Sequence, residues 1–316
     1  MTVHVLVTCP HLQRTIDHYR PLFQKLNIEI TTPSFHQKMK EEELIKIIER
    51  FDGVIAGDDE FTANVLKHGK KLKIIAKWGV GVDGIDLKAA EKLGIKVMNT
   101  PAVFSNEVAD MVIGYLILLS RKLHLIDRNV RSGQWDETQI QGISLEGKTL
   151  GIIGVGNIGR EVAVRARAMK MHVLGYDLYP PPEEFIRNTQ IRMVEVSELI
   201  SASHFITLNC NLTEQNRHIL NPDSFSRMKK GVFIVNTSRG QLIDEAALAE
   251  GFRTGIVAGA ALDVFEEEPL PGNSPLRQFE NCILGAHNSS NTFDAVMRTN
   301  ELAINNLLNG LGVKRE

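Results

Sequence analysis

The stretch that decides the fold is KTLGIIGVGNIGREVAVRARAMKMHVLGYD, residues 148–177. It begins with a short apolar strand at 150–153 and turns through GVGNIG, residues 154–159, into a segment whose apolar residues recur at helical spacing. A second apolar strand follows at 173–176. This order of strand, glycine-rich turn, helix and strand predicts a parallel βαβ unit with the turn at the carboxyl end of its first strand.

The three glycines of this turn have separate steric uses. Gly154 permits a tight turn, Gly156 lets the backbone approach a pyrophosphate, and Gly159 allows the helix to pack against the strand. Asn157 and Ile158 stand where the helix begins, and a helix N-terminus offers N–H groups and the positive end of its dipole to phosphates. The turn therefore predicts a dinucleotide-binding site.

An acidic residue, Asp177, ends the second strand, 18 residues after Gly159. A carboxylate at this place accepts hydrogen bonds from the adenosine ribose hydroxyls, and it repels a 2′-phosphate. The following residues, 178–182, include no Arg or Lys that would reverse that preference. The sequence therefore predicts NAD, and not NADP, as the cofactor.

The bulk composition is that of an ordinary globular protein. With 316 residues, 43% of them apolar and 23% charged, the chain is long enough for two domains. A net charge of −2 gives no reason to expect a nucleic acid or a membrane as partner. The longest uncharged apolar run, 111–120, is half a membrane span. Three well-separated cysteines indicate reduced thiols and no metal site, so we expect a cytoplasmic protein.

Apolar strand candidates alternate with amphipathic helical segments along the whole chain. Before the glycine turn, strands are expected at 3–7, 28–31, 54–56, 74–76 and 96–98, and helices at 11–25, 41–50, 62–68, 87–93 and 106–121. After it, strands are expected at 205–208, 232–236, 259–262 and 282–284, and a helix at 293–311. We expect a Rossmann-type doubly wound parallel sheet, residues 100–287, inserted in a smaller flavodoxin-like α/β domain, residues 1–99 and 288–316.

Three further stretches carry residues suited to one reaction, and each lies at the end of an expected strand. They are VNTSRG at 235–240, GAALDVFEEEP at 259–269 and LGAH at 284–287. Because ligands of an open α/β sheet bind beyond the carboxyl ends of its strands, these stretches can converge beside a bound nicotinamide.

The reduction of a 2-oxo acid requires a cation for the carboxylate and an acid that protonates the forming alkoxide. Arg239 can grip the carboxylate and the carbonyl oxygen through its planar guanidinium group. His287 can give or take the hydroxyl proton, since an imidazole titrates near neutral pH. Glu268, if hydrogen-bonded to His287, would orient the ring and favour its protonated form. The cofactor supplies the hydride.

The chain resembles the D-isomer-specific 2-hydroxyacid dehydrogenase family, and most closely its phosphoglycerate dehydrogenase branch. The resemblance covers nearly the whole chain and depends on GIIGVGNIGR at 151–160, NTSRG at 236–240 and ALDVFEEEP at 261–269. It implies that the catalytic residues are Arg239, Glu268 and His287.

The resemblance also implies binding roles for other residues. Thr237 and Ser238 of the NTSRG stretch would contact the cofactor, and Asp263 would lie near the nicotinamide carboxamide. Backbone N–H groups of the loop 79–83, notably those of Val80 and Gly81, would bind the substrate carboxylate in a smaller substrate domain that closes over the site.

A homodimer formed through the cofactor domains is implied as well. The expected contact consists of the long helix at 106–121 and an arm through 131–135, because an exposed tryptophan such as Trp135 is a common interface anchor.

Some positions depart from the family pattern. The loop after 205–208 reads Asn209-Cys210-Asn211 where His-x-Pro is usual, and Ala286 stands in place of the usual proline before His287. Branches that act on phosphoglycerate often carry an arginine after the strand at 54–56, whereas this chain has Gly57-Asp58-Asp59-Glu60. Three consecutive acids near a substrate would repel a phosphate, unless cations elsewhere, such as Lys77, His11, Arg14 or a residue of a partner subunit, compensate them.

Several functions therefore stay open. The branch resemblance makes 3-phosphoglycerate the expected substrate, and hydroxypyruvate, glyoxylate or a sugar-acid derivative are alternatives. Formate oxidation in the same fold would not need the Glu268–His287 pair, because formate has no hydroxyl proton. From another class, an NAD-sensing, corepressor-like binding protein would need the cofactor site without turnover.

Overall fold

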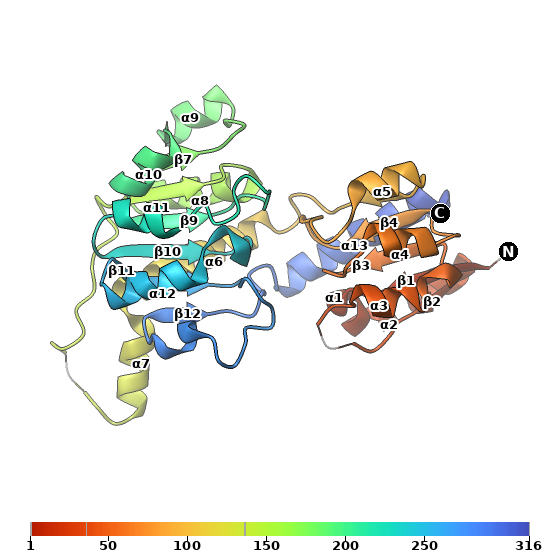
Figure 1. Ribbon diagram of the computed structural model, residues 1–316, viewed down its shortest axis with the longest axis horizontal. Coiled ribbons are helices and arrows are strands. Elements are labelled where there is room, and N and C mark those ends of the chain that lie inside the picture. The colour runs from red at the N-terminus through yellow and green to blue at the C-terminus, as the bar shows by residue number, and fades with distance from the viewer. Residues whose placement is uncertain (1, 36, 136, 316) are drawn as a thin grey trace. The chain divides into compact units, whose positions relative to one another are not determined.

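The computed structural model describes residues 2–35, 37–135 and 137–315. The chain divides into two compact units, which are Met1–Phe104 with Asn291–Glu316 (unit 1) and Ser105–Ser290 (unit 2). Unit 2 is thus inserted in the sequence of unit 1, as the colours in Figure 1 show. The boundaries expected from the sequence were 99/100 and 287/288. Each unit has its own sheet and its own core.

The sheet of unit 1 has five parallel strands in the order β2-β1-β3-β4-β5. Their bounds are β1 Val3–Val7, β2 Ile28–Thr31, β3 Gly53–Ala56, β4 Ile74–Lys77 and β5 Lys96–Met98. Side chains of successive residues face opposite ways, so Leu6 packs on one face and Val5 and Val7 on the other. This is the flavodoxin order, with its switch point between β1 and β3. The expected flavodoxin-like sheet is confirmed.

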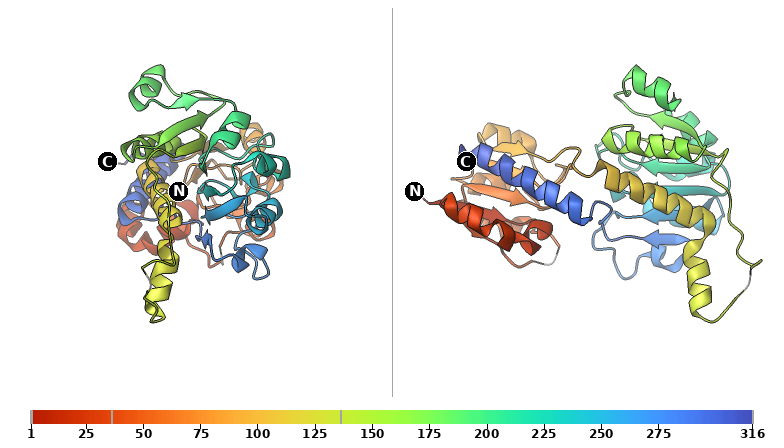
Figure 2. Two further views of the ribbon diagram at one scale, coloured as in Figure 1. Left: turned by 90° about the vertical axis from the view of Figure 1, so that its left-hand side faces the viewer. Right: turned by 180° about the vertical axis from the view of Figure 1, so that it is seen from behind.

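Helices cover both faces of this sheet (Figure 2). One face is covered by α1 Pro10–Arg14, α2 Ile16–Lys25 and α13 Phe293–Leu311, and the other by α3 Glu41–Ile45, the 3-10 turn η1 Ile48–Arg50, α4 Ala63–His68 and α5 Leu87–Lys92. The single helix expected at 11–25 is wrong. The chain breaks at Thr15, whose hydroxyl bonds to the carbonyl oxygens of His11 and Leu12 and competes with helical bonding.

The helix α13 has the bounds expected from the sequence and packs closely on β3 and β4. A Cβ placed on Gly53 would lie 2.7 Å from a Leu307 methyl, and one placed on Gly310 would lie 2.4 Å from the Ile74 side chain. The indole of Trp78 also donates a hydrogen bond of 2.8 Å to Asn300 Oδ1. The last helix of the chain therefore completes the core formed by the first hundred residues.

The sheet of unit 2 has seven parallel strands in the order β12-β11-β10-β9-β6-β7-β8. Their bounds are β6 Thr149–Ile153, β7 His172–Tyr176, β8 Arg192–Met193, β9 Phe205–Leu208, β10 Val232–Asn236, β11 Val257–Leu262 and β12 Cys282–Leu284. Its switch point lies between β6 and β9, where strands on either side run in opposite chain order. The expected Rossmann-type parallel sheet is confirmed.

Both faces of this sheet are also covered (Figure 1). One face carries α6 Ser105–Arg121, α8 Asn157–Ala168 and α9 Glu183–Thr189, and the other carries α10 Val196–Ala202, α11 Pro222–Arg227 and α12 Glu245–Arg253. Two 3-10 turns, η2 Gly240–Leu242 and η3 Pro275–Gln278, follow β10 and β11. Within the described ranges, no helix has the length and apolarity that crossing a membrane requires.

One helix lies outside these layers. None of the nine residues of α7, Leu123–Arg131, is buried, and Figure 1 shows it extending from the end of α6 past the β12 edge. Two polar contacts join it to the rest of unit 2, because His124 and Arg128 bond to Glu280 just before β12. The sequence analysis expected a helix at 106–121 and an arm at 131–135 and made no prediction for the residues between them, so it missed this helix.

Candidate active site

The glycine turn connects β6 to α8 with the geometry that its sequence predicts. Gly154 has a φ of 94°, and a Cβ there would lie 2.5 Å from the Cys210 nitrogen. A Cβ on Gly159 would lie 2.0 Å from the Gly154 carbonyl oxygen. A Cβ on Gly156, by contrast, would meet nothing within 4 Å. The fold itself thus requires Gly154 and Gly159, whereas Gly156 keeps a space beside the helix N-terminus open.

Two further residues of the turn use their side chains within unit 2. Asn157 Oδ1 accepts a hydrogen bond of 2.7 Å from Arg160, and Ile158 packs partly buried against the core beneath α8. Both stand at the first positions of α8, so a phosphate would meet their backbone N–H groups.

Asp177 follows β7 and braces this turn. Its Oδ2 accepts a hydrogen bond of 2.7 Å from the Val155 nitrogen, and its Oδ1 accepts one of 2.9 Å from the Tyr179 nitrogen. Each carboxylate oxygen has a second lone pair, so these bonds leave acceptor capacity for ribose hydroxyls. The structure therefore places the carboxylate beside the glycine turn.

The residues at this edge fit a dinucleotide. The open space at Gly156 admits a pyrophosphate against the backbone. Two buried side-chain oxygens for which the described chain provides no hydrogen-bond partner, Thr237 Oγ1 and Ser289 Oγ, follow β10 and β12. Because buried polar atoms are nearly always paired in the working state, these oxygens are candidates to bond a ligand.

The stretch after β10 holds Arg239 through its backbone. The buried Asn236 side chain accepts from the Ser238 nitrogen at 3.0 Å and donates to the Arg239 carbonyl oxygen at 2.8 Å. Ser238 Oγ donates to the Leu208 carbonyl oxygen at 2.6 Å, so its hydroxyl ties this stretch to β9. The sequence analysis gave Asn236 no role. The signal was an asparagine ending an otherwise apolar buried strand.

Asp263 follows β11 and organises the loop that carries His287. Its buried carboxylate accepts from the nitrogens of Asn288 and Ser289 at 3.1 and 2.8 Å, and its carbonyl oxygen accepts from the His287 nitrogen at 2.7 Å. Burial, with the charge of Asp263 beside it, raises the pKa of the Tyr115 phenol to about 12. The hydrogen bonds of the Asp263 carboxylate are thus with this loop.

Glu268 and His287 form a direct pair. Glu268 Oε2 lies 2.7 Å from His287 Nδ1, and Glu268 Oε1 accepts a hydrogen bond of 3.0 Å from the Phe265 nitrogen. Both side chains are partly exposed, at 23% and 30%. The pair expected from the sequence is present, at the carboxyl end of the sheet where β11 and β12 run side by side.

The backbone of the expected carboxylate loop in unit 1 is fixed by its neighbours. Gly79, with a φ of 115°, exchanges hydrogen bonds with Thr100, and Asn99 donates to the Val80 carbonyl oxygen at 2.7 Å. The N–H groups of Val80 and Gly81 donate to no atom of the described chain. Both are therefore backbone donors in a rigid loop after β4.

The acidic run after β3 differs from the expectation that it repels phosphate. Asp58 pairs with Lys77 at 3.0 Å and Glu60 pairs with Lys38 at 3.0 Å. Asp59 is 1% exposed, and its carboxylate accepts hydrogen bonds from the nitrogens of Met39 and Gly57. Two of the three carboxylates are thus offset by lysines and the third faces inward, so the run does not form a repulsive acidic surface.

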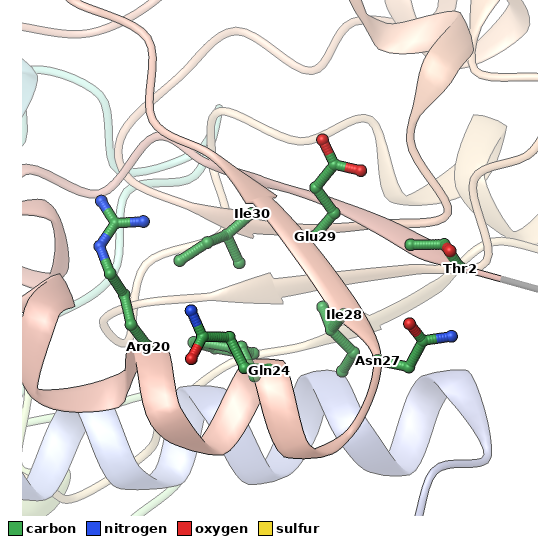
Figure 3. A pocket seen from close by; sticks show the side chains of 8 residues that line it. Thr2, Arg20, Gln24, Asn27, Ile28, Glu29 and Ile30 are labelled. Carbon is green, nitrogen blue, oxygen red and sulfur yellow. The ribbon is translucent and has the colours of Figure 1, made fainter.

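Unit 1 also has a hollow of about 340 Å³ that none of the expected site residues lines. Arg20 and Gln24 of α2 line it with residues from Asn27 to Ile30 (Figure 3). It adjoins the amino ends of β1 and β2, whereas ligands of such sheets bind at the carboxyl ends. Within the described ranges, no group of three or more His, Cys, Asp or Glu residues is arranged to hold a metal ion.

Known proteins match this arrangement. Residues 113–289 match the model of the D-isomer specific 2-hydroxyacid dehydrogenase NAD-binding domain. Hydroxypyruvate reductase of Thermotoga maritima is 37% identical, with 92% of this chain and 94% of that protein covered. D-3-phosphoglycerate dehydrogenase of Archaeoglobus fulgidus is 35% identical over 96% of this chain but only 56% of its own length, so this chain spans about half of that relative.

A solved structure agrees with these relatives. The D-lactate dehydrogenase of Aquifex aeolicus complexed with NAD and lactic acid superposes with a TM-score of 0.86 at 26% identity, with 96% of this chain and 93% of that chain covered. Fold, cofactor domain and relatives thus agree. The chain belongs to the D-isomer-specific 2-hydroxyacid dehydrogenase family of NAD-dependent oxidoreductases.

Proposed function

We propose that this protein interconverts a 2-oxo acid and its D-2-hydroxy acid with NAD(H). The observation that carries the proposal is the Glu268–His287 pair, 2.7 Å apart, on the sheet edge that also carries the open glycine turn. A paired imidazole is the group that a hydroxyl-to-carbonyl interconversion requires, because one proton must be moved with each hydride.

Each residue has a separate task in this proposal. With His287 Nδ1 bound to Glu268, Nε2 is the nitrogen that would exchange the proton with the substrate oxygen. The Glu268 carboxylate fixes the ring and favours its protonated form. Arg239 would bind the carboxylate and polarise the carbonyl group. Bound NADH would supply the hydride at the carbonyl carbon.

For the substrate, we propose an unphosphorylated acid such as hydroxypyruvate or glyoxylate ahead of 3-phosphohydroxypyruvate. The side chain of Lys77 at the end of β4 is 6% exposed. Its ammonium group contacts the Asp58 carboxylate at 3.0 Å and donates to the Trp78 carbonyl oxygen at 2.6 Å. A phosphate at this edge would compete with Asp58 for the cation, whereas a neutral hydroxymethyl group would not.

The test is the steady-state rate of NADH oxidation with hydroxypyruvate, glyoxylate and 3-phosphohydroxypyruvate. We expect the two unphosphorylated acids to give the higher kcat/KM. Asp58→Asn is expected to raise kcat/KM for the phosphorylated acid alone, and Glu60→Gln, which changes charge two residues away, is its control. A strong preference of the wild-type protein for 3-phosphohydroxypyruvate would contradict the substrate assignment.

The partner we propose is a second copy of the chain. Leu123, Ile126 and Val130 recur at helical spacing on α7 and are 39 to 49% exposed, and Trp135 is 79% exposed. Apolar side chains gathered on one projecting segment are typical of an interface. Light scattering is expected to give a dimer mass, and Ile126→Glu is expected to lower it, with exposed Val164→Glu on α8 as control.

We also propose that the protein acts in the cytoplasm. Its three cysteines, Cys9, Cys210 and Cys282, are free thiols, and two of them are buried. Unpaired cysteines are usual in a reducing compartment. Fractionation of cells that produce the protein would test this proposal.

A further inference from the structure

Glu268 lies in a turn that contains three consecutive glutamates, Glu266 to Glu268. Like charges this close repel one another, so the turn needs opposing charges or donors to keep one conformation. His287 provides one for Glu268. A second histidine, His218, provides one for Glu266, since its Nε2 contacts the Glu266 carboxylate. Sequence reasoning missed this second pair.

Glu266 is held from three other segments of unit 2. Its nitrogen donates to Glu245 Oε1 at 2.8 Å, at the start of α12. Its carbonyl oxygen accepts a bond of 2.9 Å from Gln241 Nε2 in η2. Its carboxylate meets His218, which lies in the segment between β9 and α11. Every polar group of Glu266 is therefore engaged.

His218 is itself fixed before it reaches Glu266. Its nitrogen donates to the Gln241 carbonyl oxygen at 2.8 Å, and its φ of 52° is unusual for a residue with a side chain. The backbones are also closely packed, because a Cβ on Gly240 would lie 1.8 Å from the Phe265 carbonyl carbon. The stretch after β10 that carries Arg239 thus abuts the turn that carries Glu268.

We propose that His218 is a positioning residue, which acts through Glu266 to hold Glu268 against His287. This inference rests on the proposed function. Only one residue separates Glu266 from Glu268, so a displacement of the first is passed to the second. The side chains of His218 and Glu266 are 34% and 33% exposed, so their pairing contributes little to the free energy of folding. Its effect falls on the geometry of the catalytic pair.

The charged groups around the turn come from several segments. Glu245 lies on α12, Glu266 to Glu268 form the turn, His218 precedes α11 and His287 follows β12. Arg239 lies on the adjoining stretch after β10, and Asp263 bonds to the loop that carries His287. In this set, loss of the Glu268 contact would leave the His287 imidazolium less favoured. Removal of a positive charge at position 218, acting only through space, would favour that imidazolium. The two effects have opposite signs, which separates them in a pH profile.

The experiment compares His218→Ala, His218→Gln and Glu267→Gln with the wild-type protein, with hydroxypyruvate and NADH. Glutamine keeps an N–H donor for Glu266, and Glu267 is an exposed carboxylate in the same turn, so its variant is the charge control. Three quantities are measured for each: kcat, the NADH dissociation constant, and the pH above which the reduction rate falls to half. Glu268→Gln calibrates complete loss of the pair.

We expect His218→Ala to lower kcat at least about tenfold, since displacements near 1 Å cost up to about a hundredfold. We also expect it to move the half-rate pH downward, in the direction of Glu268→Gln, with NADH affinity within about twofold of wild type. Glutamine at 218 is expected to restore most of kcat, and Glu267→Gln to change nothing.

An unchanged kcat in His218→Ala, or a half-rate pH that moves upward, would overturn the positioning role while wild-type turnover still supports the proposed function. Absence of turnover by the wild-type protein with every 2-oxo acid would overturn both.

Discussion

The two sheets share a parallel, doubly wound architecture, but their switch points are finished differently. In unit 1 the switch point between β1 and β3 is filled by the chain's own carboxylate. Asp59 accepts hydrogen bonds from the Thr8 hydroxyl and from the nitrogens of Met39 and Gly57. Burial raises the pKa of the Asp59 carboxyl, and the three donors act against that rise. The hydrogen-bond donors at this switch point are therefore paired with a side chain of the protein itself.

In unit 2 the switch point between β6 and β9 carries the glycine turn. Asp177 braces the turn from its flank through Val155 and Tyr179, and the space beside Gly156 stays open. The same topology therefore gives either a closed structural edge or a ligand site. The outcome depends on whether a side chain of the protein supplies the anion at the switch point.

The largest expected effect concerns the carboxyl end of the unit 2 sheet, where we place the catalytic reaction. Arg239→Ala is expected to lower kcat/KM by about a thousandfold, which is near the upper cost of removing one transition-state donor. The NADH dissociation constant is expected to stay at its wild-type value, because the proposed contact of Arg239 is with the substrate. Steady-state kinetics and NADH fluorescence titration measure both, with exposed Arg227→Ala as control. A parallel loss of NADH affinity would refute the role.

The next largest effect concerns the switch point of unit 1, which the Asp59 carboxylate fills. Asp59→Ala leaves the Thr8 hydroxyl and the nitrogens of Met39 and Gly57 without their buried acceptor. We expect the free energy of unfolding of unit 1 to fall by about 3 kcal/mol, with NADH affinity unchanged. Urea denaturation measures the loss, and Asp17→Ala, at an exposed carboxylate of the same unit, is the control. A stability change below that of the control would show that the edge is not held by Asp59.

Substitution of one glycine at each switch point sharpens the comparison between the two units. Gly156→Ala adds a methyl group where nothing lies within 4 Å, so the fold is expected to persist while NADH affinity falls by about a hundredfold. Gly57→Ala places a Cβ 3.2 Å from the Thr8 carbonyl oxygen, so it is expected to alter stability and leave NADH affinity unchanged. Equal NADH affinities in the two variants would remove the distinction between the edges.

A smaller effect is expected at Asp177. Asp177→Ala is expected to weaken NADH binding by about tenfold and to relax the rejection of NADPH. Asp177→Asn separates the contribution of the negative charge from that of the hydrogen bond to the glycine turn. The amide oxygen still accepts from the Val155 nitrogen, while the charge is lost. Dissociation constants for NADH and NADPH measure the ratio. If the ratio stayed constant in both variants, the ribose assignment would fail.

The smallest effect is a change in the pH dependence of stability. Burial, and then the charges of residues 266–268, raise the pKa of the Glu245 carboxyl above its ordinary value of 4.5. A raised folded-state pKa means that the stability contribution is present below the unfolded value and is lost as pH rises through the folded value. Glu245→Gln cannot titrate, so its unfolding free energy is expected to fall less between about pH 4 and about pH 8. An identical fall in both proteins would contradict this.

Local patterns in the sequence predicted most of the architecture. Strand bounds such as those of β9 and β10, and both ends of α13, followed from apolar runs and helical periodicity, because these signals lie within a few residues of one another. The steric requirements at Gly154 and Gly159 likewise followed from their spacing. The break at Thr15 was missed, since it depends on which carbonyl groups a single hydroxyl reaches.

Contacts between distant segments were harder to predict. The Glu268–His287 pair joins residues 19 apart and was expected because the chemistry requires it and the family resemblance implies it. The His218–Glu266 pair spans 48 residues and no motif indicates it. The sequence indicated Lys77 as one of several cations that could offset the acidic run, but it did not predict the pairing of Lys77 with Asp58, because the two residues lie at the ends of different strands. Spacing along the chain does not encode such pairs, which depend on strand order and loop path.

The insertion of unit 2 has a consequence during translation. The helix α13 covers β3 and β4, yet 188 residues (105–292) separate it from the rest of unit 1. At about 5 to 20 residues per second, the ribosome needs about 10 to 40 s to add them. Throughout that interval one face of the nascent five-stranded sheet lacks the part of its cover that α13 provides. Unit 2 is therefore expected to fold first, although unit 1 begins to emerge before it.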